Sequence, residues 1–269
     1  RIRVVTGEQR FALGVQLIEG RHDALEISAG YARVAEAAIQ VLANATIAEF
    51  QATHGRVPGC ALLILALGRL GGEALTHASD LDLIFLFTGD HSAESDGARP
   101  LGATQYYNRL TARIVTALSV PTAAGPLYEV DTRLRPSGTQ GPLAVTFESF
   151  RKYQRESAWT WEHMALSRAR PVYGSTADRA QLKDEICSIL KTEREPEVLR
   201  KAVRKMRLDI VEHKPPKGPL DTKMMEGGLV DWEFIIHFLQ LKTGDALYPQ
   251  LGKAVRALVA QGHLGEDMV

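Results

Sequence analysis

The chain is organised around the segment GRLGGEALTHASDLDLIFLF, which occupies residues 68–87. Its glycines predict a turn, and its apolar end, from Leu81 to Phe87, has the length and composition of a buried strand. Asp80 and Asp82 are separated by one residue where this strand begins. Because alternate residues of a strand point the same way, we expect both carboxylates on one side and Leu81 and Leu83 on the other.

The Asp80–Asp82 pair predicts a metal site. Two carboxylates held this close repel each other unless a cation lies between them, and hard oxygen ligands suit Mg²⁺ or Mn²⁺. The alternative is that the pair only marks the solvated end of a strand. The glycine turn before the pair favours a nucleotide site, because Gly71 and Gly72 would let backbone N–H groups approach phosphate oxygens.

A third carboxylate is expected on a neighbouring strand, since two-metal phosphoryl chemistry needs ligands for both ions. The segment from Leu127 to Leu134 predicts that strand, and Asp131 is the candidate ligand. Alternation puts Glu129, Arg133 and Arg135 on the same face as Asp131. Arginine forks match phosphate oxygens, which makes Arg133 and Arg135 candidates for triphosphate contacts. The alternative is an internal salt-bridge ladder with Glu129.

The remaining pattern predicts one more strand, from Cys60 to Leu67, and several helices. The helices are expected at about residues 23–54, 104–119, 146–170 with interruptions, 199–210 and 229–241. Everything after Pro171 is expected to be helix and loop. The predicted fold class is therefore α+β: a small mixed sheet flanked by an N-terminal helix and followed by a helical domain, divided into residues 1–54, 55–145 and 146–269.

Composition excludes several classes of protein. Lys+Arg and Asp+Glu are balanced at 32 each, so no overall positive field attracts nucleic acid. No apolar run is long enough to cross a bilayer. Two cysteines are too few for a disulfide framework and suit a reducing cytoplasm, where we expect the protein to act. The chain starts at Arg1 without a basic-then-apolar leader, and we expect it to be a fragment of a longer protein.

A Gly-Gly turn followed by Asp-x-Asp on a strand resembles the DNA polymerase beta-like nucleotidyltransferase superfamily. Three further segments narrow the resemblance to the glutamine synthetase adenylyltransferases. They are DTRLRPSG at 131–138, YQRESAWTWEH at 153–163 and DTKMMEGG at 221–228. Members of that family contain two related nucleotidyltransferase units, one removing AMP from glutamine synthetase and one adding it, and this chain looks like the second.

The resemblance implies a function and a set of site residues. It implies transfer of AMP from ATP to a tyrosine of glutamine synthetase by a catalytic domain at residues 55–145, with PII signalling protein and glutamine as regulators. Asp80, Asp82 and Asp131 are the expected catalytic residues and metal ligands. The expected nucleotide contacts are Gly71, Gly72, Ser79, Arg133, Arg135 and Lys223.

Alternatives remain open for the helical part and for the activity. Lys223, Gly227 and Gly228 precede a predicted helix whose N-terminus suits an anion, but the glycines equally suit a plain turn into a buried helix. Arg168 and Arg170 either reach the nucleotide or form internal ion pairs. The chain could instead be the AMP-removing unit, a relative that uridylylates a signalling protein, or a non-catalytic glutamine- or PII-sensing module.

Overall fold

The structure, a computed structural model, describes residues 1–123 and 125–265. It forms two compact units. Unit 1 comprises Arg1–Tyr153 and Ala169–Lys183, and unit 2 comprises Gln154–Arg168 and Asp184–Val269. The three-part division predicted from the sequence stays a prediction about domains. In the compact units, the N-terminal helices belong with the sheet.

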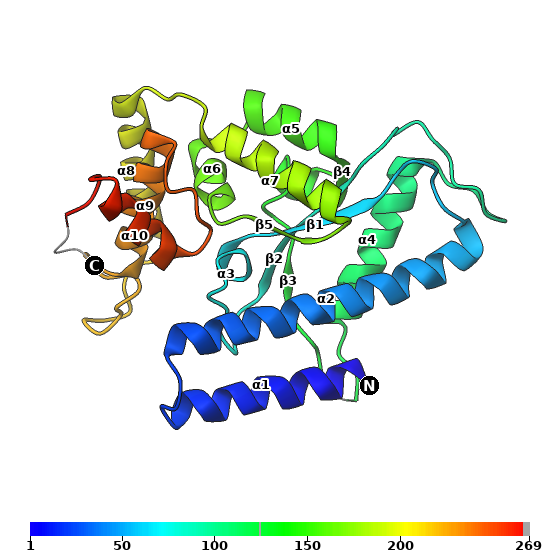
Figure 1. Cartoon of the computed structure of the whole chain (residues 1–269), viewed down its shortest axis with the longest axis horizontal. Helices are drawn as coiled ribbons and strands as arrows, with labels where there is room; N and C mark the ends of the chain where they lie inside the picture. The colour runs from blue at the N-terminus through cyan, green and yellow to red at the C-terminus, as the bar shows by residue number, and fades with distance from the viewer. Residues whose placement is uncertain (124, 266–269) are drawn as a thin grey trace. The chain divides into compact units, whose positions relative to one another are not determined.

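The helices and strands of the chain are labelled in Figure 1 in their order along the sequence. The helices are α1 (Ile2–Ile18), α2 (Ala24–His54), α3 (Gly68–Gly71), α4 (Ala103–Ser119), α5 (Phe147–Glu156), α6 (Thr160–Leu166), α7 (Thr176–Leu190), α8 (Pro196–His213), α9 (Leu229–Thr243) and α10 (Leu251–Ala260), with a short 3₁₀ turn at Gly138–Gln140. The strands are β1 (Leu62–Ala66), β2 (Leu81–Phe87), β3 (Val130–Asp131), β4 (Ala144–Thr146) and β5 (Arg170–Tyr173).

Unit 1 is built on a mixed five-stranded sheet in which β2 is the central strand. On one side of β2, β1 pairs antiparallel with it, and β5 in turn pairs antiparallel with β1. β3 pairs parallel with the start of β2, while β4 pairs parallel with its end. The sheet and the surrounding helices confirm the predicted α+β class.

Alternation along β2 divides its side chains as predicted. Leu81, Leu83 and Phe85 are buried in one cluster with residues of α2 and α4, whereas Asp82 is not part of that cluster. Helix α1 lies alongside α2 (Figure 1). The helices α2 and α4 thus cover one face of the sheet and leave the Asp82 side of β2 available for a site.

Local signals set the helix ends. The Asp23 carboxylate accepts a hydrogen bond from the Leu25 N–H at 2.8 Å, which caps the start of α2. Gly55, at φ 72°, ends that helix where the sequence predicts. The Thr146 hydroxyl accepts a hydrogen bond from the Ser149 N–H at 2.9 Å, which caps the start of α5.

The third strand is much shorter than predicted. Only Val130 and Asp131 pair with β2, and the alternation assumed for residues 127–134 is therefore wrong. The Asp131 carboxylate accepts a hydrogen bond from the Arg133 N–H at 2.8 Å, an Asx turn that bends the chain away from the sheet. Arg133 and Arg135 consequently follow a turn and do not extend the Asp131 face of a strand.

Strand β5 contradicts the expectation of helix and loop around Pro171. Proline cannot donate a ladder hydrogen bond, so it is rare inside a sheet. Yet β5 lies at the sheet edge and pairs only with β1, with a register irregularity between Ile64 and Leu65. An edge position tolerates the missing N–H, and this is the physical reason for the error.

Unit 2 is helical in its described part. The helices α8, α9 and α10 pack in sequence, and α6 packs against α8 and α9. Ile236, Ala246, Ala254 and Leu258 form one of its buried clusters. No helix of the described residues is both long and apolar enough to span a bilayer.

Candidate active site

Three carboxylates meet at the start of β2. Asp82 is the second residue of that strand, and the parallel pairing of β2 with β3 puts Asp131 directly beside it. Asp80, Asp82 and Asp131 each offer a carboxylate oxygen, and these oxygens lie within 4.8 Å of one another. Asp80 is exposed, while the other two are half-buried. The expected convergence is therefore observed, and the role of these residues as metal ligands stays a prediction.

Gly68 is fitted to the Asp82 carboxylate. It directly follows Leu67, whose N–H donates to the Asp82 carbonyl at 3.0 Å. Gly68 has φ +54°, and a Cβ at this position would lie 2.1 Å from Oδ2 of Asp82. Only a residue without a side chain allows this approach. The glycine therefore helps to fix the position of the carboxylate, a role that the sequence reading did not assign to it.

A single guanidinium sits on the carboxylate cluster. Nε of Arg133 donates to Oδ2 of Asp131 at 2.8 Å, and Nη2 donates to the same oxygen. This contact holds the pKa of Asp131 below its ordinary value. Asp131, and then the charges of Asp82 and Asp80, raise the pKa of Arg133. Arg133 thus pairs with Asp131, a carboxylate of the site itself. The alternative was an internal salt bridge with Glu129, and the structure does not have it among the described residues.

The glycine turn is folded into a short helix. The Gly71 N–H donates to the Leu67 carbonyl at 2.8 Å, and the Gly72 N–H donates to the Gly68 carbonyl at 3.1 Å. Both N–H groups are thus used inside the turn. The Ser79 hydroxyl accepts from the Thr76 N–H at 3.0 Å and shares a 2.8 Å hydrogen bond with the Thr76 hydroxyl. Nucleotide contacts by Gly71, Gly72 and Ser79 stay a prediction.

Arg135 and Lys223, which were also expected to contact the nucleotide, have other contacts in the structure. Arg135 is buried, and its guanidinium donates to the carbonyls of Thr132 at 2.8 Å and Gly141 at 3.2 Å. Its observed contacts therefore hold together the loop after β3. Lys223 belongs to unit 2, in the turn before α9, where its carbonyl accepts from the Val230 N–H at 3.1 Å.

Arg170 supports the glycine turn from outside the motif. Its guanidinium donates to the carbonyls of Gly71 at 3.2 Å and Leu70 at 3.1 Å, and it forms an ion pair with Glu36. Of the two alternatives for Arg170, a nucleotide contact or an internal ion pair, the structure therefore has the ion pair. Because these partners lie far from Arg170 in the sequence, no spacing in the chain could have indicated them.

Among the residues that the structure describes, Asp80, Asp82 and Asp131 are the only group of His, Cys, Asp or Glu side chains close enough together to hold a metal ion. Glu233 and His237, four residues apart on α9, have other partners. Glu233 pairs with Arg168 at 2.8 Å. Nδ1 of His237 lies 2.7 Å from the Ser167 hydroxyl. Both side chains are thus used in contacts within unit 2.

The chain is similar to a set of nitrogen-metabolism enzymes. A family model described as glutamate-ammonia ligase adenylyltransferase matches residues 1–208. A bifunctional glutamine synthetase adenylyltransferase/adenylyl-removing enzyme from Brucella suis biovar 1 (strain 1330) is 46% identical over 242 residues, covering 90% of this chain and 25% of that protein.

Two further relatives carry the same name. The protein from Agrobacterium fabrum is 44% identical over 242 residues, which cover 90% of this chain and 24% of the relative. The protein from Xanthobacter autotrophicus is 41% identical over 269 residues, which cover 98% of this chain and 27% of the relative. The chain thus spans about a quarter of the length of the relatives it matches.

Proposed function

The chain belongs to the glutamate-ammonia ligase adenylyltransferase family, and from that premise we propose that unit 1 transfers AMP from ATP to a tyrosine of glutamine synthetase. The observation that carries this proposal is the convergence of Asp80, Asp82 and Asp131 within 4.8 Å. A catalyst of phosphoryl transfer needs such a concentration of negative charge to hold divalent cations. Folding alone gives no reason to collect three carboxylates at one strand end.

The residues of the cluster fit a hard divalent cation. Carboxylate oxygens are the ligands that Mg²⁺ and Mn²⁺ prefer, and the cluster already attracts the positive charge of Arg133. Asp80, Asp82 and Asp131 would hold the ions. When bound, such ions neutralise charge on the phosphate oxygens and polarise the reacting oxygen.

Arg133 is the residue we expect to contact the triphosphate. Its side chain is 75% exposed beside Asp131, so it can change partner at little cost in burial. A guanidinium binds two phosphate oxygens at once, which would orient the nucleotide over the carboxylates. Gly68 and Arg170 act as positioning residues in this proposal, since they fix Asp82 and the glycine turn.

The direction of the reaction is part of the proposal. The relatives are named for both adenylyl transfer and adenylyl removal, and the chain spans about a quarter of them. The removing activity, driven by orthophosphate, is therefore the second candidate for the same carboxylate site. Regulation by PII protein and by glutamine belongs to the proposal as well.

Transfer of labelled AMP from α-labelled ATP to glutamine synthetase tests the function. We expect labelling by the natural chain and its loss in Asp80→Ala plus Asp82→Ala. Glu129→Ala is the matched control, because it removes a carboxylate two residues from Asp131 that lies outside the cluster. Equal labelling by the natural chain and the double variant would refute the proposed site.

A second assay separates the two directions. Adenylylated glutamine synthetase is incubated with the chain and orthophosphate, and the release of ADP is measured. Transfer from ATP without this release supports the proposed direction, whereas release without transfer supports the second candidate. Binding of ATP with Mg²⁺, together with no transfer in either direction, would support a sensing module instead.

A further inference from the structure

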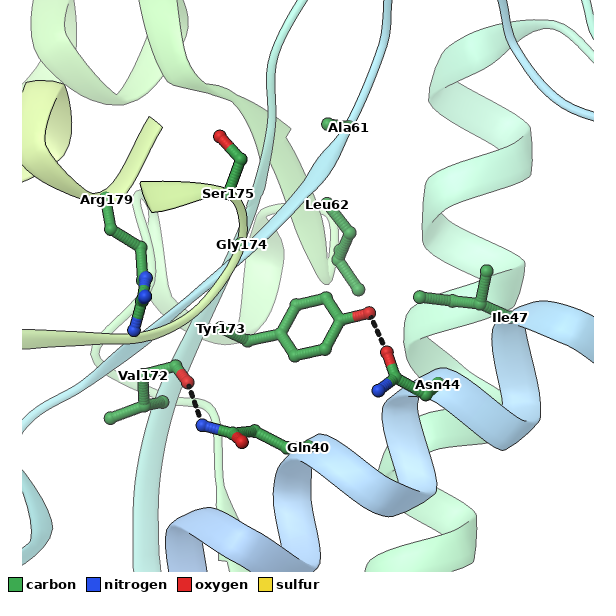
Figure 2. Close-up of a pocket in the computed structure, with 10 residues that line it drawn as sticks. All are labelled: Gln40, Asn44, Ile47, Ala61, Leu62, Val172, Tyr173, Gly174, Ser175 and Arg179. Atoms are coloured by element: carbon green, nitrogen blue, oxygen red, sulfur yellow. Dashed lines mark hydrogen bonds between the residues drawn. The ribbon is translucent and has the colours of Figure 1, made fainter. Parts of the chain in front are cut away.

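Unit 1 has a second polar pocket, at the other end of β1 from the carboxylates. Figure 2 shows this pocket, which has a volume of about 400 Å³ and is lined by parts of α2, β1, β5 and the start of α7. Ala61 and Leu62 border it at the beginning of β1. The carboxylate site lies beyond the opposite end of that strand, next to Gly68. The two sites share no residue.

Arg179 brings a positively charged side chain without a bound partner to this pocket. Among the described residues its side chain has no hydrogen-bond or ion-pair partner, and Nε is buried without an acceptor. None of the ten residues that line the pocket is an aspartate or glutamate. A buried unpaired donor of a charged group costs free energy unless a ligand or ion satisfies it. The arrangement therefore calls for an anion.

Neighbouring side chains supply further polar groups in fixed positions (Figure 2). The Tyr173 hydroxyl donates to Oδ1 of Asn44 at 2.6 Å, which leaves the Nδ2 group of Asn44 as a donor for a ligand. Nε2 of Gln40 donates to the Val172 carbonyl at 3.4 Å. These hydrogen bonds hold the two amides at the pocket before any ligand arrives.

A glycine keeps the chain close to the sheet where it turns from β5 towards α7. Gly174 has φ +129°, and a Cβ there would lie 2.4 Å from Cδ2 of Leu63. A side chain at this position would push the β5–α7 connection, and with it Ser175 and Arg179, away from the sheet. The pocket thus depends on backbone geometry as well as on its polar side chains.

We propose that this pocket binds a small anion, a carboxylate or phosphate compound, through the Arg179 guanidinium. A guanidinium pairs with either group through two parallel hydrogen bonds. A volume of about 400 Å³ lies near the lower end of the range for small-molecule sites, which suits a compact metabolite. This site is independent of the proposed transfer reaction.

Isothermal titration calorimetry of the 269-residue chain tests the proposal, with succinate as the carboxylate probe and inorganic phosphate as the phosphate probe. Metal ions are removed from the chain beforehand with a chelating resin, so that metal-dependent binding at the aspartates does not contribute. We expect at least one probe to bind and Arg179→Gln to weaken it about tenfold or more. Lys183→Gln, which removes an exposed charge from the same helix outside the pocket, should change affinity by less than about twofold.

The outcomes decide both the site and its ligand class. Loss of succinate binding alone assigns a carboxylate, and loss of phosphate binding alone assigns a phosphate. Unchanged binding in a folded Arg179→Gln variant overturns the proposal, as does no binding of either probe up to about 10 mM. If circular dichroism shows that Arg179→Gln is unfolded, Arg179→Lys decides instead, because lysine cannot form the two parallel hydrogen bonds of a guanidinium: weaker binding supports the site and unchanged binding overturns it.

Discussion

The two units use ionisable side chains in opposite ways. Unit 1 gathers Asp80, Asp82 and Asp131 within 4.8 Å, with the guanidinium of Arg133 bound to one of the three. Unit 2 contains half-buried ion pairs of one cation with one anion, namely Arg168 with Glu233 and Arg207 with Asp231. Crowded like charges oppose folding, while matched charges are neutral towards it or favour it. The difference indicates a binding role in unit 1 and a structural role in unit 2.

His237 is a further example from unit 2 of an ionisable side chain with a structural role, because burial keeps it neutral. It is buried, with 7% of its surface exposed, and Nδ1 lies 2.7 Å from the Ser167 hydroxyl and 3.1 Å from Oε1 of Gln240. Burial lowers the pKa of His237 to about 4. With these partners, the neutral His237 side chain serves packing and hydrogen bonding inside unit 2.

The largest predicted effect is on the carboxylate cluster of unit 1, and it comes from a variant that keeps all three carboxylates. Gly68→Ala places a Cβ 2.1 Å from Oδ2 of Asp82 in a left-handed backbone, at a cost of roughly 4 kcal/mol. We expect the Mn²⁺ affinity of unit 1 to fall by about a hundredfold or more. The matched control is Gly59→Ala, since Gly59 also has a positive φ of 70° but its Cβ would meet nothing within 4 Å.

Calorimetric titration with Mn²⁺ measures both glycine variants. The control shares the backbone strain and lacks the clash, so only Gly68→Ala should lose the cation. Equal affinities in the two variants would show that Gly68 does not position Asp82.

A pH titration tests the structural role of the buried His237 in unit 2. Above about pH 6.5 His237 is neutral in both states and its contribution to stability is fully present. As the pH falls from about 6.5 to about 4, the unfolded chain binds a proton that the folded chain excludes. Unit 2 should therefore lose up to about 3 kcal/mol of its free energy of unfolding over this range.

Tryptophan fluorescence follows this loss selectively, because Trp159, Trp161 and Trp232 are the three tryptophans of the chain and all lie in unit 2. Urea unfolding is measured across this pH range for the natural chain and for His237→Gln. The variant should lose the part of the pH dependence that His237 contributes, while the half-buried His163, whose pKa burial also lowers, keeps its own part. An undiminished dependence in His237→Gln would assign it to other groups.

The smallest predicted effect sharpens the role of Arg133. The contact with Asp131 is exposed on the arginine side, so it contributes little to the free energy of unfolding. Arg133→Gln should tighten Mn²⁺ binding by about threefold, because a competing positive charge leaves the cluster. The same variant should weaken ATP binding measured in the presence of Mn²⁺. A parallel weakening of both would mean that Arg133 only maintains the local fold.

Much of unit 1 could be predicted because its signals are local. The apolar run from Leu81 to Phe87 is bounded by polar residues, and its strand limits were predicted correctly. The spacing of Asp80 and Asp82, with a third carboxylate on a paired strand, was enough to predict their convergence with Asp131. Period-two geometry and strand pairing are short-range rules that a sequence states directly.

The rest depended on contacts that the sequence does not state. The short β3 results from a hydrogen bond between the Asp131 side chain and the Arg133 backbone. β5 contains Pro171, and only its edge position in the finished sheet makes that acceptable. The partners of Arg170 come from α2 and α3, which no spacing rule connects to it.

Direct titration of the chain with Mn²⁺ tests the central claim that three aspartates of unit 1 form a cation site. The natural chain should bind Mn²⁺ saturably, as should the Glu129→Gln control. In Asp80→Asn plus Asp82→Asn the affinity should fall by at least about a hundredfold, since even residues that only support metal ligands contribute roughly ten- to hundredfold. Equal Mn²⁺ affinity in the natural chain and the double variant would contradict the account.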